Sequence, residues 1–549
     1  MRDPQAVPPG YDLWSQIPVR YNAGRDLTDA HGARGRGRQV ALYWENSAGE
    51  ARALTFWALS ELTNRFANAL AALGVARGDR ILLRVPNIPE FLVAALGANK
   101  LGAIYIPTST LFREKEIAYR IRDAQAKLVL TTPPLYAEVE AVRTECPSLC
   151  HVMVIPARGA SAPRGTVDFR AALDTAPRTL AHVPTMHDDL ALLAYTSGTT
   201  GDPKGVTHYQ RYPAAYDNLV RWWYDFRPGD VVTCPSEIGW MLPVATFLYA
   251  LRVGCTVFMY HEVEGPFRPE SWLPLIRKYR ISNFTAAPTV YRMLLTVADA
   301  ERRFDLSSLR HAVSAGEALP ADTLAELDRR FGIRPMDGIG MSECMVYNFN
   351  RIGMPLRAGS CGKPGPGLRI GLLNDALQPV ARGTPGILCL RREDHPGIMR
   401  EYWCKPEKTA EILRGDWYVS GDVMIEDEDG YLWFQGRADD VINASGYRIS
   451  PFEVENLLMS HPAVLEAAAV ESPDAVRGNV VKAFVVLRAG AAVSEALAEE
   501  LRKHCRAQAA PFKTPRLIKF MEALPKTQSG KIKRKELRQT EMARVGSSV

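Results

Sequence analysis

Residues 195–205 read Tyr-Thr-Ser-Gly-Thr-Thr-Gly-Asp-Pro-Lys-Gly, and they follow the apolar run 190–194. The apolar run predicts a buried strand, and the stretch after it predicts a loop. Such a loop suits a polyphosphate, because its glycines let backbone N–H groups approach the anion and its hydroxyls donate further hydrogen bonds. An ammonium group adds positive charge. We interpret the stretch as a phosphate-binding loop formed by Thr196, Ser197, Gly198, Thr199, Thr200, Gly201 and Lys204.

This loop differs from the P-loop of nucleoside triphosphatases. That motif needs Gly-Lys followed by Ser or Thr, whereas Pro203-Lys204-Gly205 stands here. Composition alone would favour a Ser/Thr/Gly surface linker. The strand before the loop and the Pro-Lys-Gly exit after it favour phosphate binding instead.

Length and composition describe an ordinary globular protein with several folding units. The chain has 549 residues, of which 47% are hydrophobic and 23% charged. Its net charge of +6 is small for this length and gives no support to a nucleic-acid partner. The nine cysteines form neither a disulfide framework nor a zinc-finger pattern, so a reducing compartment, the cytoplasm, is expected. The N-terminus lacks the apolar core of a signal peptide.

Strands and helices alternate along most of the chain. We expect helices at 58–73, 90–101 and 115–123, and strands at 81–85, 103–107, 128–131, near Val231, and at 256–259, 283–286 and 311–314. This alternation predicts parallel sheets flanked by helices, arranged as two doubly wound α/β halves. Residues 1–50 are expected to lie on the surface. The apolar run 238–260 is interrupted by Pro243 and Arg252, which favours a buried helix and a strand over a membrane span.

The pattern changes after residue 360. Strands at 368–373 and 387–390 and a hairpin at Asp429-Gly430 predict a small β-rich subdomain over residues 360–436, within an N-terminal domain 1–438. An α+β C-terminal domain follows at 439–549. Its first helix is marked by Ser450-Pro451-Phe452-Glu453, with an N-cap serine, a proline at the first helical position and a capping-box glutamate.

The loop at 195–205 resembles the signature of the adenylate-forming (ANL) superfamily, which includes acyl-CoA synthetases, firefly-type luciferases and the adenylation domains of peptide synthetases. Further stretches resemble that superfamily in the same order, and together they extend from about residue 40 to residue 540. They are Ser314-Ala315-Gly316-Glu317, Asp337-Gly338-Ile339-Gly340-Met341-Ser342-Glu343, Ser420-Gly421-Asp422, Gly436-Arg437-Ala438-Asp439-Asp440, Ser445-Gly446-Tyr447-Arg448 and Pro525-Lys526-Thr527-Gln528-Ser529-Gly530-Lys531.

The resemblance implies a fold and a set of site residues. The fold is a large N-terminal domain of two doubly wound α/β subdomains and a small β subdomain, followed by a mobile α+β C-terminal domain that swings about Asp439. The implied ATP/AMP-binding residues are Thr196, Ser197, Gly198, Thr199, Thr200, Gly201, Lys204, Gly316, Glu317, Asp337, Gly338, Ile339, Gly340, Ser342, Asp422, Arg437 and Arg448.

The same resemblance implies catalytic roles for Thr196, Lys204, Glu343 and Lys531, with Glu343 and Thr196 at the Mg²⁺ site. Lys531 would be the lysine of the adenylation step, where a mobile charge can neutralise the reacting carboxylate and phosphate. Ser445, Gly446 and Tyr447 would line the tunnel for CoA. The sequence departs from the usual superfamily pattern at Ile339, Ser342 and Asn443, where Tyr, Thr and Lys are common.

The resemblance also implies an acyl pocket lined by Trp240, Ala315, Gly316, Gly340 and Met341. In acetyl-CoA synthetases a Trp closes the pocket at the position of Gly340, so a larger acid is expected here. The segment 237–240, Glu-Ile-Gly-Trp, resembles medium-chain acyl-CoA synthetases, whereas the stretch 337–343 resembles benzoate-CoA ligase equally well. The expected substrate is a medium-chain, branched, cyclic or aromatic acid of fatty acid metabolism or aromatic acid degradation.

These features predict an AMP-forming acyl-CoA synthetase that uses ATP, Mg²⁺ and coenzyme A. The acid attacks the α-phosphate to give an acyl-adenylate, and the CoA thiol then displaces AMP. Two alternatives stay open: a stand-alone adenylation enzyme that loads a carrier protein, and a non-catalytic protein that binds ATP or acyl groups. A lysine acetyltransferase and a deacetylase acting on Lys531 would switch adenylation off and on by removing and restoring its charge. A homo-oligomer is left open.

Overall fold

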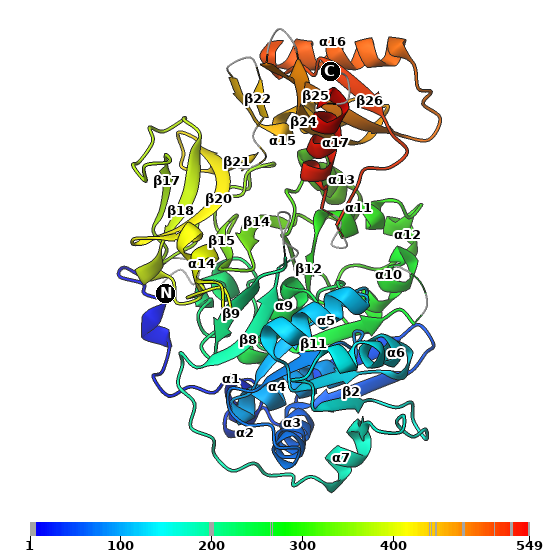
Figure 1. The fold of residues 1–549 in the computed structure, drawn as a ribbon, viewed down its shortest axis with the longest axis vertical. Coiled ribbons are helices and arrows are strands. Elements are labelled where there is room, and N and C mark those ends of the chain that lie inside the picture. Colours follow the sequence, from blue (N-terminus) through cyan, green and yellow to red (C-terminus); the bar gives the residue numbers. More distant parts are fainter. Residues whose placement is uncertain are drawn as a thin grey trace. The chain divides into compact units, whose positions relative to one another are not determined.

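The computed structural model describes residues 7–196, 202–263, 265, 267–438, 440, 442–444, 447–474, 478–509, 511–527 and 531–546. The chain divides into two compact units (Figure 1). The first contains the chain up to Thr196, then Pro203–Arg369 and Arg391–Tyr418, and the second contains Ile370–Leu390 and the chain from Val419 onward. Each unit is described by itself.

The first unit contains a seven-stranded sheet that ends at the predicted phosphate-binding loop. Its strands are parallel except for the last, which pairs antiparallel with its neighbour. Their order is β7 (Val167–Asp168), β6 (His151–Val154), β5 (Leu128–Thr131), β3 (Arg80–Leu83), β4 (Ile104–Pro107), β8 (Leu190–Tyr195) and β9 (Gly205–Tyr209). The helices of this half include α3 (Phe56–Ala72), α4 (Pro89–Leu101), α5 (Glu114–Ala124), α6 (Pro133–Ala141) and α7 (Phe169–Thr175).

A nine-stranded sheet forms the other half of the first unit. It is parallel from β14 to β1 and antiparallel at both edges. The order is β16 (Lys363–Pro364), β15 (Met345–Phe349), β14 (Met336–Met341), β13 (His311–Ser314), β12 (Asn283–Ala286), β10 (Val231–Thr233), β11 (Thr256–His261), β1 (Val40–Asn46) and β2 (Ala51–Thr55). Its helices include α8 (Asp217–Trp222), α9 (Met241–Val253), α10 (Pro269–Lys278), α11 (Pro288–Leu295) and α13 (Ala321–Phe331).

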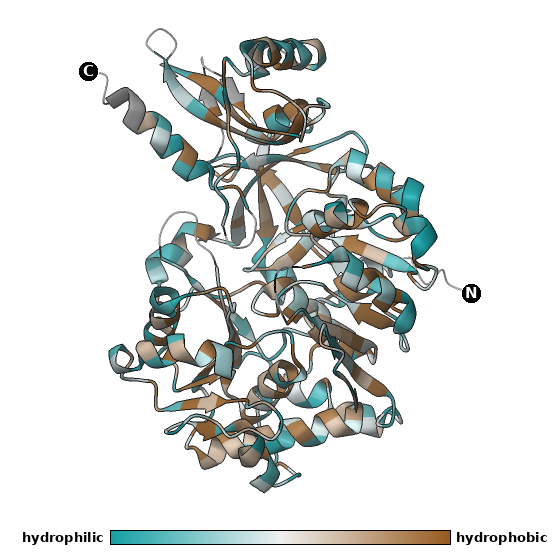
Figure 2. Ribbon diagram, turned by 90° about the vertical axis from the view of Figure 1, so that its right-hand side faces the viewer, coloured by the Kyte–Doolittle hydropathy of each residue, from teal (hydrophilic) through white to brown (hydrophobic). Residues whose placement is uncertain are grey.

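The predicted alternation of strands and helices is confirmed. The strands expected at 128–131, 283–286 and 311–314 occur with those bounds. The apolar run 238–260 forms α9 and β11, and across the described part of the chain no helix is long and apolar enough to cross a membrane. In Figure 2 the inner strands are largely hydrophobic, whereas hydrophilic residues gather on the outer helices. Parallel strands covered by helices on both faces are buried, which explains why they are hydrophobic.

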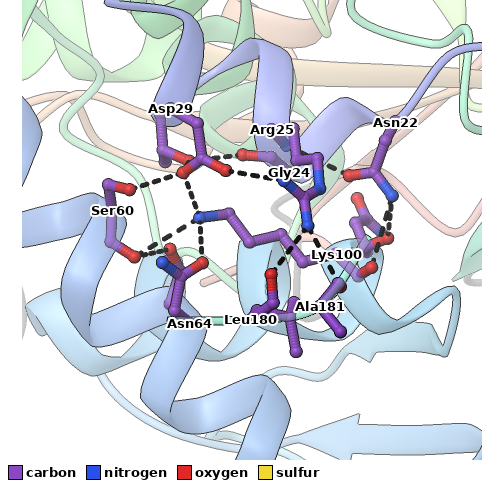
Figure 3. A network of polar contacts seen from close by, with 12 residues as sticks. Asn22, Gly24, Arg25, Asp29, Ser60, Asn64, Lys100, Leu180 and Ala181 are labelled. Carbon is purple, nitrogen blue, oxygen red and sulfur yellow. Dashed lines mark hydrogen bonds and ion pairs between the residues drawn. The ribbon is translucent and has the colours of Figure 1, made fainter. Parts of the chain in front are cut away.

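The expectation that residues 1–50 lie on the surface is wrong for the part from Tyr21 to Asn46, which contains many buried residues. Strand β1 pairs with β11 and β2 inside the nine-stranded sheet, and Leu42 is fully buried. A helical segment before it, α1 (Ala23–Asp26) and α2 (Asp29–Ala33), is also anchored. Asp29 accepts a hydrogen bond from Lys100 of α4 at 2.5 Å, and the same ammonium donates to Asn64 of α3 at 2.7 Å (Figure 3). The Pro- and Arg-rich composition of the segment gave no sign of this burial. Its charged side chains can be buried because they form ion pairs and hydrogen bonds.

The second unit includes most of a β-rich sheet, of which Arg391, Leu413–Arg414 and Trp417–Tyr418 belong to the first unit. A five-stranded sheet has the order β17 (Ile370–Leu373), β18 (Gly386–Arg391), β20 (Trp417–Glu426) and β19 (Leu413–Arg414), with β21 (Leu432–Arg437) paired to β20. The boundary between the compact units falls inside β18 and β20. Strands β20 and β21 form the hairpin predicted at Asp429-Gly430.

The rest of the second unit is α+β, as predicted. A sheet β24 (Val464–Asp474), β25 (Gly478–Leu487) and β26 (Leu517–Phe520) is accompanied by α15 (Pro451–Met459), α16 (Glu495–Gln508), α17 (Arg534–Gly546) and the pair β22 (Ile442–Ala444) and β23 (Tyr447–Ile449). Ser450 caps α15, because its Oγ accepts the N–H of Glu453 at 3.2 Å and proline occupies the first turn.

Candidate functional site

The phosphate-binding loop is predicted where β8 turns back into β9. Tyr195 pairs with Gly205, and the N–H of Thr196 donates to the C=O of Lys204 at 3.0 Å, which closes the base of the loop. The Oγ1 atom of Thr196 is buried and has no hydrogen-bond partner among the described residues. Ser197, Gly198, Thr199, Thr200 and Gly201 lie outside the described residues. The closing strand β9 was not predicted from the sequence.

Two charged residues of the predicted site meet at one aromatic side chain, Tyr402. Glu343 follows β14 and is 8% exposed. Its Oε1 accepts a hydrogen bond from the Tyr402 hydroxyl at 2.6 Å. The Nζ atom of Lys204 lies 4.4 Å from the centroid of the Tyr402 ring, a cation–π contact. Lys204 and Glu343 therefore contact the same side chain: Lys204 contacts the ring of Tyr402, and Glu343 contacts its hydroxyl.

The segment around Tyr402 connects the two halves of the first unit. The N–H of Met399 donates to the C=O of Glu343 at 2.8 Å, and the N–H of Trp403 donates to the C=O of Gly205 at 2.7 Å. Tyr402 also forms a β-bridge with Val206. Sequence reasoning missed this segment, because its contacts join residues far apart in the chain and no local motif marks them.

The stretches predicted to bind adenine meet at neighbouring strand positions. Ser314, the last residue of β13, pairs with Asp337 of β14, so Ala315, Gly316 and Glu317 follow directly beside that strand. Gly316 has φ +101, and a Cβ there would meet nothing within 4 Å. Glu317 accepts from the Thr289 hydroxyl at 3.1 Å and pairs with Arg292 at 3.3 Å.

Asp337 is the most unusual carboxyl of this group. It is buried, its Oδ2 accepts the N–H of Leu319 at 3.3 Å, and its Oδ1 has no partner among the described residues. Burial raises the pKa of Asp337 to about 8, partly opposed by the backbone N–H groups of Leu319 and Gly338. A buried acceptor or donor without a partner is costly unless a ligand completes it.

The rest of the 337–343 stretch is shaped by close packing. A Cβ at Gly340 would lie 1.9 Å from the carbonyl oxygen of Met345 on β15, and one at Gly338 would lie 2.8 Å from Val346. Ile339 also belongs to β14, and Ser342 follows that strand. The Sδ atom of Met341 accepts from the hydroxyl of Tyr418.

The segment predicted to face the acyl group is tied to the loop after β4. Glu237 accepts hydrogen bonds from the hydroxyls of Ser109 and Thr110, each at 2.6 Å. Trp240, the N-cap residue of α9, lies edge-on to Phe112 with ring centroids 5.8 Å apart. These contacts hold the Trp240 side chain beside an apolar neighbour.

The predicted ribose-binding pair lies in the second unit. Asp422 on β20 and Arg437 on β21 are register partners, and the guanidinium donates to Oδ1 of Asp422 at 2.9 Å. The same nitrogen donates to the C=O of Ser420 at 2.8 Å. Gly421 between them has φ +75, which favours glycine.

Lys531 is exposed and is hydrogen-bonded to Thr527. Its N–H donates to Oγ1 of Thr527 at 3.1 Å, and its C=O accepts from the N–H of Thr527 at 2.8 Å. Asp439, Ser445 and Gly446 lie outside the described residues, as do the side chains of Asn443, Tyr447 and Arg448.

The residues of the first unit fit a magnesium-bound nucleotide. Thr196 Oγ1 and Asp337 Oδ1 are buried groups that a ligand would satisfy. Lys204 supplies a cation and Glu343 a carboxylate, and Mg²⁺ in nucleotide sites prefers one or two carboxylates together with phosphate oxygens.

Comparison with known proteins agrees with this chemistry. The model of the AMP-binding enzyme family matches residues 30–403, and that of the AMP-binding enzyme C-terminal domain matches residues 453–531. The chain is 36% identical over 537 residues to the mitochondrial acyl-coenzyme A synthetase ACSM3 of Homo sapiens, with 96% of this chain and 90% of that protein covered.

Solved structures are similar over nearly the whole chain. The anthranilate CoA ligase AuaEII, in complex with anthranoyl-AMP, has a TM-score of 0.87 and 33% identity, with 96% of this chain and 98% of that one covered. A benzoate CoA ligase from Burkholderia xenovorans LB400 has a TM-score of 0.81 and 29% identity, with 94% and 100% covered.

The chain belongs to the AMP-binding enzyme family, the adenylate-forming superfamily that its sequence resembles. It is an AMP-forming acyl-CoA ligase, an enzyme that uses ATP, Mg²⁺ and coenzyme A.

Proposed function

We propose that this ligase activates a medium-chain, branched, cyclic or aromatic carboxylic acid. The carboxylate oxygen attacks the α-phosphorus of ATP, and pyrophosphate leaves. The thiol of CoA then attacks the carbonyl carbon of the acyl-adenylate, loses its proton and displaces AMP. The mixed anhydride is itself the activated acyl group, so no serine or cysteine nucleophile is required.

The observation that carries this proposal is the meeting of Lys204 and Glu343 at Tyr402, next to the base of the loop closed by Thr196. Lys204 and the Thr196 hydroxyl would bind phosphate oxygens, and Glu343 with Thr196 would hold the metal. Bound Mg²⁺ would neutralise charge on the phosphates. Preorganised charges of this kind stabilise the transition state without reorganising during the reaction.

The roles of Asp337 and Asp422 are supported by their contacts, and the other roles rest on the resemblance to the superfamily. Asp337, beside Gly316, Glu317, Gly338, Ile339 and Gly340, would contact the adenine, and its unpartnered Oδ1 favours a polar ligand there. Asp422, oriented by Arg437, would accept from the ribose hydroxyls. Lys531 would neutralise charge during adenylation, Asp439 would be the hinge, and Ser445, Gly446 and Tyr447 would line the path of CoA.

Support for the substrate range comes from the acyl side. Trp240 lies against Phe112 and is held by the Glu237 contacts, which gives an apolar wall. Two of the similar solved structures are an anthranilate CoA ligase and a benzoate CoA ligase, and both acids are aromatic. One methylene changes discrimination by only about 1–3 kcal/mol, so a range is proposed rather than one acid.

Acid-dependent exchange between ATP and pyrophosphate, measured without CoA, tests this assignment. The wild-type enzyme should exchange label with an acid of the proposed range, and Glu343→Gln should need much more Mg²⁺ to do so. Exchange that is absent with every acid of the range would contradict the proposal. The predicted cytoplasmic location and the acetylation of Lys531 stay predictions.

A further inference from the structure

Tyr402 contacts two residues that the proposed function places at the nucleotide. Its hydroxyl donates to Glu343 Oε1 at 2.6 Å, and its ring lies 4.4 Å from Nζ of Lys204. The two contacts use different parts of the side chain. A single substitution can therefore remove one and keep the other.

The Tyr402 side chain is held in place from several directions. It is 3% exposed and packs with Ala194, Val206 and Met399 in a small apolar cluster. Its backbone N–H donates to the Thr409 hydroxyl at 2.9 Å, and its backbone bridges to Val206. A side chain fixed in this way can hold other groups within the narrow tolerance that a reacting site needs.

The hydroxyl determines how the Glu343 carboxylate is presented. An ionised carboxylate accepts hydrogen bonds and metal ions through both oxygens. Because the phenol occupies one direction at Oε1, the carboxylate has a preferred rotation, and its other lone pairs stay available to a cation. Hydrogen-bond partners behind a metal ligand act in this way, and their loss costs about 10–100-fold in metal affinity or activity.

The ring gives the Lys204 ammonium a contact that uses none of the lone pairs of the Glu343 carboxylate. A cation over an aromatic face is attracted to the ring without forming a hydrogen bond to an acid. Lys204 can therefore stay close to the metal-binding carboxylate without being paired to it, and both charges remain available to a nucleotide.

We propose that Tyr402 is a positioning residue for adenylation: its hydroxyl orients Glu343 toward the metal of Mg-ATP, and its ring positions Lys204 for the phosphates. This inference depends on the proposed roles of Glu343 and Lys204. It assigns to one side chain the spacing between the metal ligand and the phosphate-binding cation.

Two variants separate the contacts. Tyr402→Phe keeps the ring and removes the hydroxyl, and Tyr402→Leu removes both. Titration calorimetry on the full chain, with Mg-ATP and with ATP in EDTA as probes, should show that Tyr402→Phe weakens Mg-ATP binding about tenfold and leaves metal-free ATP binding unchanged. Tyr402→Leu should weaken both. Tyr224→Phe is the matched control, because it removes another buried phenol, which contacts Thr246 at 3.1 Å, and should change neither affinity.

A double-mutant cycle with Glu343→Gln tests whether Tyr402 acts through Glu343. If it does, adding Tyr402→Phe to Glu343→Gln should cause no further loss of Mg-ATP affinity, whereas a general structural defect would add to it. Wild-type Mg-ATP affinity in Tyr402→Phe, or full additivity, would overturn the inference while leaving the proposed function intact. A Glu343→Gln enzyme with unchanged Mg²⁺ dependence would instead overturn the proposed metal role.

Discussion

A Cβ atom on Gly340 would lie 1.9 Å from the carbonyl oxygen of Met345. The two residues lie on the antiparallel strands β14 and β15, where the register shifts between Ile339 and Gly340. Real Cβ atoms do not approach backbone this closely, so the strand pairing itself requires glycine here. The sequence suggested a different reason for glycine at this position, namely that the missing side chain opens the acyl pocket. That explanation is still a prediction, whereas the close packing is observed.

Gly340→Ala should therefore destabilise the fold, because the added methyl meets backbone that cannot move without breaking the strand pairing. We expect a loss of about 1–3 kcal/mol in the free energy of unfolding, measured by urea denaturation. An alanine variant as stable as the wild type, but restricted to smaller acids, would show that pocket size rather than packing selects glycine.

Asp337→Asn should change how stability depends on pH. Burial raises the pKa of Asp337 to about 8, so the folded state holds its proton where the unfolded chain has already released it. The contribution of the Asp337 carboxyl to the free energy of unfolding is fully present below its pKa in the unfolded chain, about 3.9. It is lost as the pH rises through its pKa in the folded state. Relative to the asparagine variant, the wild type should lose more than about 1 kcal/mol between about pH 5 and about pH 8.

The check is urea denaturation of both proteins across that range. Parallel stability curves would contradict the raised pKa, and a wild type that gains stability with rising pH would reverse its sign.

Lys531→Ala should separate the two half-reactions. Adenylation should fall by about 100-fold or more, because a charge that stabilises the transition state is gone. CoA should still react with a preformed acyl-adenylate, since that step is assigned to Ser445, Gly446 and Tyr447. Single-turnover measurements of each half-reaction distinguish them. Equal loss in both would indicate a folding defect, and unchanged adenylation would remove Lys531 from the mechanism.

Lys100→Met should destabilise the anchored N-terminal segment. The Lys100 side chain is fully buried, and its loss leaves Asp29, which also accepts from Ser60, with only its longer ion pair to Arg25 at 3.5 Å (Figure 3). Breaking a fully buried pair costs about 3–5 kcal/mol. Because Asp29 is 28% exposed and keeps Arg25, we expect a loss below that range, measured as a lower midpoint of thermal unfolding. The control is Lys127→Met, which breaks a partly exposed pair with Asp79 worth about 0–1 kcal/mol. Equal effects of the two substitutions would contradict a special role for the buried network.

Local sequence predicted the elements whose residues are buried on both sides. The strand at 128–131 is a mostly apolar run, and those at 283–286 and 311–314 mix apolar and polar residues within the alternating pattern of strands and helices. Ser450 marked a helix start by its own side chain. Elements decided by distant partners were missed. Strand β1 is buried because it pairs with β11, more than two hundred positions later in the chain. No local pattern in residues 1–50 predicts this pairing.

The site shows the same division. The loop base at Thr196 and Lys204 and the Asp422–Arg437 contact involve motif residues that the sequence had singled out. Tyr402 was not, because its role follows from one hydroxyl contact to Glu343 and one ring contact to Lys204, and both partners lie far away in the chain. Motif reading identifies groups that can react, and the fold is needed to show what holds them.

The most direct test of the proposed ligase is release of AMP from ATP, measured with and without CoA, across acetate, butyrate, 2-methylpropanoate, octanoate, cyclohexanecarboxylate and benzoate. We expect CoA-dependent turnover with at least one acid larger than acetate and little turnover with acetate. Adenylate formation that CoA cannot discharge would indicate a carrier-protein acceptor instead. No AMP release with any of these acids, or a preference for acetate, would contradict the proposed function.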